Sequence, residues 1–250
     1  MNWAARICAA AAMVSSLAAW AQETNNQLWV DGIIGRNIAG IYMFETEFSY
    51  QTLLSDQDRW QSLNATPSLE LSLGPHVDLV SGIPLSYTVQ NDSTKTAEVR
   101  GMLGMRYYFT PFKRVQTRML VRWEERFVRD EETYDVVQSD RLRVRAEVAL
   151  PLDDINWHTD TMWYALADVE AFFTASEDAP ERFANRLRAR IGAGRKFSYN
   201  WRLEFIYTVQ RSRNALEDLD PSTDHIFRFR LKCYLTPRVR KLQDAGGTGN

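Results

Sequence analysis

The chain has 250 residues, a formal net charge of −2 and a mean hydropathy of −0.38, with 45% hydrophobic and 12% aromatic residues. A charge this close to neutral gives no basic footprint for a nucleic acid, so we expect no nucleic-acid partner. After the N-terminal segment, no apolar run reaches the roughly 20 residues of a membrane-spanning helix, so a helical membrane protein is excluded.

The N-terminal residues 1–21 have the layout of a secretory signal peptide. Arg6 is the lone positive charge before an apolar run over residues 7–19, and small residues precede a cleavage site after Ala21. The run is too short to serve as a transmembrane anchor. Cleavage leaves Cys233 as the single cysteine of the exported chain, so no internal disulfide can form.

Behind this segment, apolar and polar residues alternate with a period of two. This pattern predicts β-strands, because successive side chains of a strand point to opposite faces. The first segment, residues 27–36, is the least regular and is interpreted as a partial strand. Pro84 lies inside a later segment and predicts a bulge or a locally unpaired position. Ten regular segments follow the first, over residues 41–54, 60–73, 77–90, 96–109, 115–128, 139–150, 162–174, 182–197, 201–213 and 225–235.

The alternation is clearest over residues 182–213. In the second half of this stretch, apolar residues such as Leu203 alternate with Arg202 and Glu204, which gives one apolar and one charged face. The join at residues 198–200 reads Ser-Tyr-Asn, which is short and turn-like. We therefore predict an antiparallel hairpin here.

Two folds are compatible with such two-faced strands. A soluble sandwich would turn the charged faces to water, whereas a membrane barrel would turn them inward and the apolar faces to lipid. The segments exceed the ~5–6 residues typical of soluble strands and match the ~9–11 residues of a spanning strand. Longer polar joins also alternate with shorter ones, as in barrels of the bacterial outer membrane.

We therefore predict an all-β protein, an antiparallel up-and-down transmembrane β-barrel. Single-chain barrels of this kind have an even number of strands, so about ten strands are expected, with twelve as the alternative. The barrel is assigned to residues 22–237, and residues 238–250 are interpreted as a polar C-terminal tail.

Five stretches carry a resemblance to a known family: Leu28-Trp29, the Glu-rich strand 42–50, the run 186–195 with Gly192 and Gly194, the strand 201–211 and the closing strand 224–234. In these stretches the chain resembles a family of Gram-negative outer-membrane barrels known as domain of unknown function 2490. The resemblance covers essentially the whole mature chain. It implies a barrel and export, and it implies no activity, because the family has none assigned.

The C-terminus departs from the usual pattern of outer-membrane barrels. Such chains usually end on an aromatic residue that the barrel assembly machinery reads, whereas this chain continues past its last strand as the polar tail. Either the signal is read internally, around Tyr234, or assembly is less typical.

Candidate catalytic groups are few. The three histidines, His76, His158 and His225, fall in turns, connectors or a strand start and are interpreted as surface or interfacial residues. A lipid-hydrolysing barrel would need a Ser–His pair near one rim, and Ser212 with His225 is the one pairing to name. The sequence has no G-x-S-x-G motif, no metal-ligand spacing and no phosphate loop. We therefore expect no catalytic residue, no metal and no cofactor.

Charge is the strongest inward-facing feature of the predicted strands. Buried charges must be paired, so cross-strand pairs of arginine and carboxylate would form a structural network. Arginines outnumber acids on neighbouring strands, so the same lumen is alternatively a path that prefers anions. By parity, the lumen charge network comprises Arg118, Arg122, Arg126, Arg143, Arg145, Arg188, Arg190, Arg228, Arg230, Glu45, Glu47, Glu124, Glu147, Asp168, Glu170 and Glu204.

The sequence therefore predicts an outer-membrane β-barrel that is either structural or a narrow path for small solutes and anions. An open channel is typical of about 16–18 strands, and side chains fill a barrel of about eight, so ten strands favour the structural network. An outer-membrane barrel enzyme acting on lipid is the alternative function. Outer-membrane lipid and the barrel assembly machinery are the expected partners, and the oligomeric state stays open.

Overall fold

The computed structural model describes residues 24–54, 60–90, 94–154, 157, 159–174, 184–213 and 222–236. The predicted signal peptide and the predicted polar tail lie outside these residues, as does His158. Among the described residues, no helix is long and apolar enough to cross a membrane.

All the regular structure of the described residues is β-structure. The strands are β1 (Thr24–Ile38), β2 (Tyr42–Leu53), β3 (Gln61–Ser72), β4 (Val77–Gly82), β5 (Leu85–Val89), β6 (Lys95–Tyr108), β7 (Gln116–Asp130), β8 (Val136–Pro151), β9 (Met162–Thr174), β10 (Ala184–Lys196), β11 (Trp201–Arg213) and β12 (Ser222–Tyr234).

These strands close into a barrel with eleven positions around its circumference. Strands β4 and β5 share one position, because each pairs with β3 on one side and with β6 on the other. The interruption between them falls at Ile83 and Pro84, where proline has no N–H to give to the sheet. Neighbouring groups still bond there, since Arg100 N–H donates to the Pro84 carbonyl at 2.9 Å. The predicted break at Pro84 is confirmed.

The predicted barrel fold is confirmed, and two of its features differ from the expectation. The segment interpreted as a partial strand forms β1, a full strand of 15 residues, so the barrel has eleven strand positions instead of ten or twelve. With an odd number, the first and last strands run in the same direction, so closure is parallel. Strand β1 pairs with β12 from Thr24 opposite Thr223 to Gly35 opposite Tyr234. All other neighbouring strands pair antiparallel.

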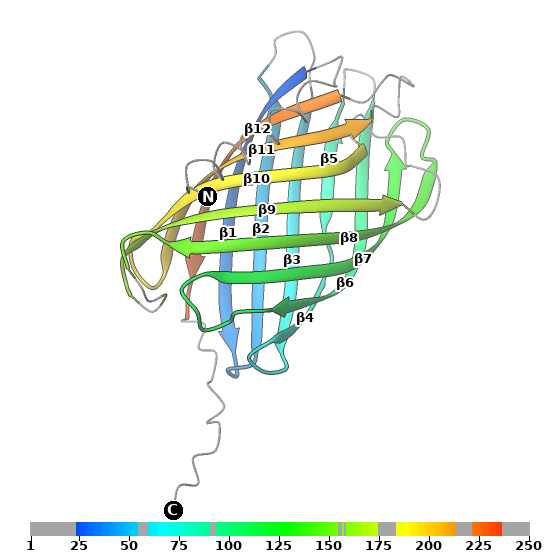
Figure 1. Cartoon of the computed structure of the whole chain (residues 1–250). Coiled ribbons are helices and arrows are strands. Elements are labelled where there is room, and N and C mark those ends of the chain that lie inside the picture. The colour runs from blue at the N-terminus through cyan, green and yellow to red at the C-terminus, as the bar shows by residue number, and fades with distance from the viewer. Residues whose placement is uncertain are drawn as a thin grey trace, which may run out of the picture.

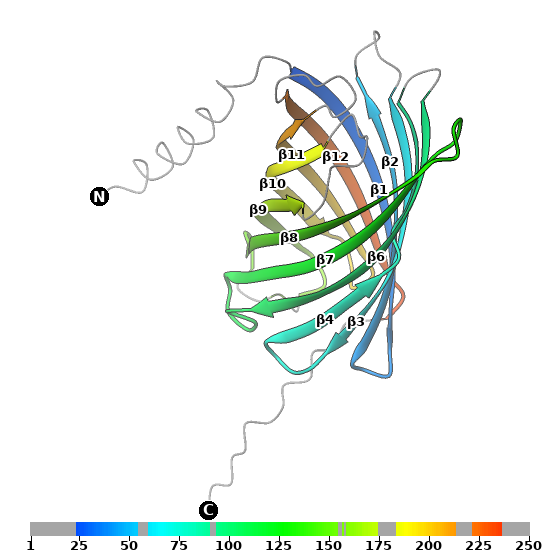
Figure 2. The same cartoon turned by 90° about the vertical axis from the view of Figure 1, so that its right-hand side faces the viewer.

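Figure 1 shows the two walls of this barrel, with β1, β2 and β3 upright at the back and β7 to β10 running across the front. The turned view in Figure 2 shows β6, β7 and β8 curving from one wall into the other. One end of the barrel, the turn end, is where β1 ends and where the described connections 39–41, 73–76, 109–115 and 197–200 lie. The opposite end, the loop end, is where β1 begins and where the described connection 131–135 lies.

The predicted hairpin over residues 182–213 is present as β10 and β11, joined by residues 197–200. Phe197 N–H donates to the Trp201 carbonyl at 3.0 Å, and this hydrogen bond closes the turn. The predicted alternation of loop length is weaker than expected at β7 and β8. Their strands extend into the acidic segment and leave only residues 131–135 between them.

Side chains on successive positions of each strand alternate between the two faces of the wall. Met102 is 7% exposed, whereas the neighbouring Leu103 is 66% exposed. The outward face is rich in exposed apolar residues such as Phe48 and Ile191, and the inward face is buried and mostly polar. The hydrophobic side chains that the sequence places at every second position therefore cover the outside of the barrel. The apolar core inside is small, since Val80, Met102 and Leu120 form its buried cluster.

Close packing of side chains on the inward face of β9, β10 and β11 depends on a glycine. Gly194 on β10 lies beside the ring of Tyr164 on β9, and a Cβ at Gly194 would lie 2.6 Å from the Tyr164 hydroxyl oxygen. That hydroxyl donates a 2.7 Å hydrogen bond to Glu204 on β11. The glycine therefore leaves the space that lets Tyr164 reach Glu204.

We expect Gly194→Ala to lower the free energy of unfolding by about 1–3 kcal/mol, because the added methyl group displaces the buried Tyr164 ring from Glu204. The measurement is urea-induced unfolding of the detergent-folded protein, followed by tryptophan fluorescence. Gly101→Ala is the matched control, since a Cβ at that strand position meets no atom within 4 Å. Equal stability of the two variants would contradict this packing.

Candidate functional site

Two cavities lie inside the barrel. The loop-end cavity has a volume of about 270 Å³ and is lined by residues near the start of β1, such as Gln27 and Trp29. The turn-end cavity has a volume of about 340 Å³ and is lined by residues near the end of β12, such as Lys232 and Tyr234. The barrel interior is therefore only partly filled by side chains.

A layer of residues between the two cavities lines both of them, and we call it the arginine layer. Two of its members, Glu47 on β2 and Thr66 on β3, lie directly opposite each other in the sheet. Four of its seven members are arginines and one is a carboxylate. The layer consists of Glu47, Thr66, Met102, Arg122, Arg145, Arg190 and Arg230.

The charges around the loop-end cavity are strongly unequal. Its lining has nine arginines and three glutamates, Glu47, Glu98 and Glu124. The turn-end cavity is closer to balance, with eight basic and six acidic side chains in its lining. The excess of positive charge is therefore concentrated at the loop end and in the arginine layer.

The loop-end cavity also has two chemically different walls. Strands β2, β3 and β5 contribute neutral polar side chains and a single charged one, Glu47, whereas most of the arginines come from β7, β8, β10 and β12. The neutral side chains bond one another, as Ser62 Oγ lies 2.9 Å from Thr88 Oγ1 and Asn64 donates to Ser62 at 3.2 Å. This hydroxyl and amide wall comprises Ser49, Gln51, Ser62, Asn64, Ser86, Thr88 and Gln90.

Glu124 on β7 is the centre of one buried ion cluster. Arg141 donates to Glu124 Oε2 at 2.7 Å, and Arg143 donates to Glu124 Oε1 at 2.9 Å. Arg122 Nε lies 2.8 Å from Glu124 Oε1. The Glu124 side chain is 1% exposed, so three guanidinium groups share one buried carboxylate. Such a carboxylate neutralises charges that would otherwise repel one another at close range.

Glu170 on β9 is the centre of a second cluster next to the first. Arg143 donates to it from Nε and Nη2, at 3.1 and 2.7 Å, and so connects the two clusters. Arg190 binds Asp168 at 2.6 Å and approaches Glu170 at 3.4 Å. Arg188 reaches Glu170 at 3.5 Å. Arg143 of β8 and the two arginines Arg188 and Arg190 of β10 are therefore held by carboxylates of β9, the strand between them.

Asp31 closes the parallel seam between β1 and β12. It lies 3.2 Å from Arg228 and 3.0 Å from Arg230, and it accepts a 2.8 Å hydrogen bond from Ser49 on β2. Trp29 lies on the same face of β1, with the Arg228 guanidinium 4.3 Å from its ring centroid. Ion pairing and cation–π contact therefore join the first strand to the last.

All the predicted lumen residues lie on inward-facing strand positions. Beyond the two clusters, Arg126 donates to Glu98 at 2.7 Å, and Arg118 pairs with Glu147, which also pairs with Arg145 at 3.6 Å. Glu204 binds Lys232 at 2.7 Å and Arg230 at 3.5 Å. Glu45 and Glu47 line the turn-end cavity from β2.

Sequence reasoning missed Asp31 as a lumen residue, and it placed Arg100 and Gln210 on the polar faces of their strands without including them in the charge network. The sequence did not indicate that Asp31 faces the lumen, because apolar residues such as Ile33 and Ile34 lie on both faces of β1. The alternation of apolar and polar residues is therefore irregular in this strand. The inward side chains of Trp29 and Ile33 flank Asp31 at intervals of two, and this spacing was the available signal. Gln210 is neutral, and a search for charge could not find it.

The structure does not support the one Ser–His pairing considered from the sequence. His225 lies opposite Val209 in the sheet, and Ser212 lies opposite Ser222. Ser212 is therefore three positions along β11 from Val209, the residue that lies opposite His225. His225 Nδ1 is instead 2.5 Å from the Tyr207 hydroxyl oxygen. The side chain of Ser212 lies outside the described residues.

Within the part of the chain that the structure describes, no group of three or more His, Cys, Asp or Glu side chains is placed to hold a metal ion. The inward charges are arranged as ion pairs and cavity walls.

Fold and interior together define a class: a closed β-barrel with an apolar outer face and a charged, partly open interior. The family model described as Protein of unknown function (DUF2490) matches residues 26–219, from β1 to beyond the end of β11. The chain belongs to this family. A comparison with curated proteins gave no match.

We expect Glu124→Gln to lower the free energy of unfolding by about 3–5 kcal/mol, because it leaves three buried arginines without their shared carboxylate charge. Denaturant unfolding of the detergent-folded protein measures the change. The matched control is Glu131→Gln, because Glu131 pairs with Arg129 at 2.7 Å on the exposed surface. Such a surface pair contributes about 0–1 kcal/mol. If both variants unfold at the same urea concentration, Glu124 is not the centre of the cluster.

Proposed function

We propose that the protein is an outer-membrane β-barrel that lets small anions pass through a narrow, arginine-lined lumen. The observation that carries the proposal is the lining of the loop-end cavity, where nine arginines stand against three glutamates. Arginine and lysine side chains around a pore favour anions. Both cavities are lined by the residues of the arginine layer, so the layer would be the selective part of the path.

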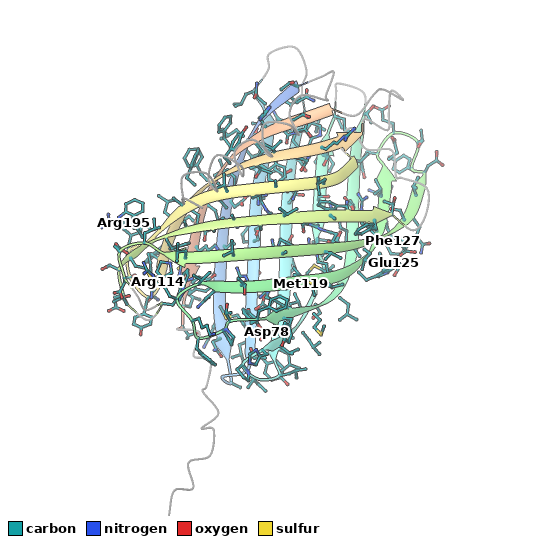
Figure 3. The ribbon with its side chains drawn as sticks, viewed as in Figure 1. Asp78, Arg114, Met119, Glu125, Phe127 and Arg195 are labelled. Atoms are coloured by element: carbon teal, nitrogen blue, oxygen red, sulfur yellow. The ribbon has the colours of Figure 1, made fainter. Side chains whose placement is uncertain are left out.

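The outer face supports a membrane location. Large exposed apolar surfaces are rare on soluble proteins and mark interaction with other molecules or with lipid. Figure 3 shows Arg114 and Arg195 at one end of the barrel and Glu125 and Phe127 toward the other. Among strand residues whose side chains the structure describes, outward-facing charges lie toward the strand ends: Arg36, Lys95, Glu125, Arg129, Asp140, Arg195 and Arg211. An apolar band between charged ends is the pattern of a transmembrane barrel.

The remaining expectations agree with this location. A signal peptide cleaved after Ala21 would export the chain, outer-membrane lipid would surround the apolar band, and the barrel assembly machinery would insert it. Tyr234, the last aromatic residue of β12, lines the turn-end cavity. An assembly signal at Tyr234 would therefore have to be read before the barrel closes.

Removing a positive charge from the arginine layer should reduce anion preference. We expect Arg145→Gln to shift the reversal potential in a KCl gradient toward that of a cation-preferring path, because the layer loses one of four arginines. Arg145 is a suitable target, since its ion pair with Glu147, at 3.6 Å, is longer than the pairs that hold Arg122, Arg190 and Arg230 at 2.8, 2.6 and 3.0 Å. The measurement is single-channel recording of the mature protein in a planar bilayer.

Two variants control this experiment. Arg145→Lys keeps the charge and should keep the selectivity, which separates charge from packing. Arg129→Gln removes the same charge from an exposed position on β7 and should leave selectivity unchanged. A correctly folded wild-type barrel that does not conduct would reject the anion path and leave a purely structural barrel, and one that prefers cations would reject the anion preference.

A further inference from the structure

We infer that the loop-end cavity binds a small hydroxylated oxyanion, meaning a carboxylate or phosphate carried on a polyol. This inference deepens the proposed anion path by naming the class of solute, and it rests on that proposal. It follows from the two walls of the cavity, from the incomplete neutralisation of its arginines and from its size.

The nine arginines that line the loop-end cavity form its arginine wall, and they favour an anionic ligand. Five further carboxylates, Asp31, Glu147, Asp168, Glu170 and Glu204, pair with arginines of the lining, so nine arginines face eight carboxylates in all. Three of these eight are shared with basic side chains outside the lining, because Glu147 also pairs with Arg118, Glu98 with Arg126 and Glu204 with Lys232. Taking an unpaired charge out of water costs several kcal/mol, so excess buried arginines favour an anion in the cavity. Guanidinium groups also match the planar fork of a carboxylate and the oxygens of a phosphate.

The positive charge of Arg188 is only partly neutralised by carboxylates, so it is available to a ligand in the cavity. Its Nε and Nη2 donate to Oε1 of Gln210 at 2.9 and 2.6 Å, so its bidentate fork holds a neutral amide. Its ion pair with Glu170 is longer, at 3.5 Å. The guanidinium is held in place by Trp29 and Phe172, each 5.3 Å from ring centroid to Cζ. A positioned arginine of this kind is pre-organised to bind an oxyanion.

The hydroxyl and amide wall of the cavity favours a ligand that also carries hydroxyl groups. Arginine only donates hydrogen bonds, whereas serine, threonine, asparagine and glutamine both donate and accept them. Ser62, Asn64 and Thr88 stand side by side on β3 and β5 and present these groups to the cavity. A polyol satisfies such a wall, because each hydroxyl also donates and accepts. Simple anions such as chloride would use the arginine wall alone.

The size of the cavity limits the ligand. Its volume of about 270 Å³ lies just below the range of about 300–1,000 Å³ typical of small-molecule pockets. The cavity therefore suits a single sugar acid or sugar phosphate and excludes an oligosaccharide.

The test is isothermal titration calorimetry of the mature protein folded in detergent, with sodium gluconate as the probe. Acetate supplies the carboxylate alone, and glucose supplies the hydroxyl groups alone. We expect gluconate to bind at least about tenfold more tightly than acetate, because one further hydrogen bond is worth about that factor, and glucose to bind more weakly than both. Glucose 6-phosphate compared with inorganic phosphate repeats the test of the hydroxyl groups for a phosphate, and glucose 6-phosphate compared with gluconate shows which oxyanion the arginines prefer.

Single substitutions test the contribution of each wall of the cavity to binding. Thr88→Val removes one hydroxyl at constant shape and should weaken gluconate binding about tenfold while leaving acetate binding unchanged. Arg145→Gln should weaken both. Thr46→Val is the matched control, since Thr46 stands on the outward face of β2 between Phe44 and Phe48. It should leave both affinities unchanged.

The outcomes distinguish this inference from the proposed path. Equal affinity for gluconate and acetate overturns the hydroxylated ligand and leaves an anion-preferring path in place. Gluconate preference in a barrel that does not conduct overturns the path and leaves the binding site. Loss of the preference in Thr46→Val as much as in Thr88→Val would also overturn the assignment to this cavity.

Discussion

Pairing of buried charges inside the barrel is the interaction on which the rest of this structure depends. Strands at eleven positions around the barrel send an apolar face outward and must send their charged face into a small interior, where each charge needs a partner. Glu124 and Glu170 meet this need by binding arginines from neighbouring strands, with Arg143 bonded to both. The wall, the cavities and the excess of positive charge all follow from how these carboxylates are shared.

The parallel seam shows the same principle at the point where the barrel closes. An odd number of strands forces the first and last strands to run in one direction, and parallel pairing is slightly weaker per residue than antiparallel pairing. Here Asp31 of β1 binds Arg228 and Arg230 of β12, so buried ion pairs reinforce the backbone hydrogen bonds of the seam. The seam also places Trp29 against the arginine wall, next to the loop-end cavity.

Local sequence patterns predicted most of the strands of the barrel, but they did not predict how the first and last strands close it. The alternation around Leu203 and Arg202 predicted a strand, its faces and its hairpin partner, because a period of two is a local property of the chain. The role of β1 depends on contacts with β12, about two hundred residues away, and both of its faces carry apolar residues, so its pattern could not reveal a full strand. Parity placed the predicted lumen charges inward, whereas the partner of each arginine depends on register between strands. The two-walled cavity depends on that register as well.

The most direct measurement is heat-modifiability of the mature protein taken from outer-membrane fractions. Boiled and unboiled samples in detergent are compared on a gel, because a closed barrel held by its sheet and its internal ion pairs stays folded until it is heated. A mobility shift, together with recovery in the outer membrane, is the expected result. No shift, with release of the protein into the soluble periplasm, would contradict a membrane barrel with its charges inside.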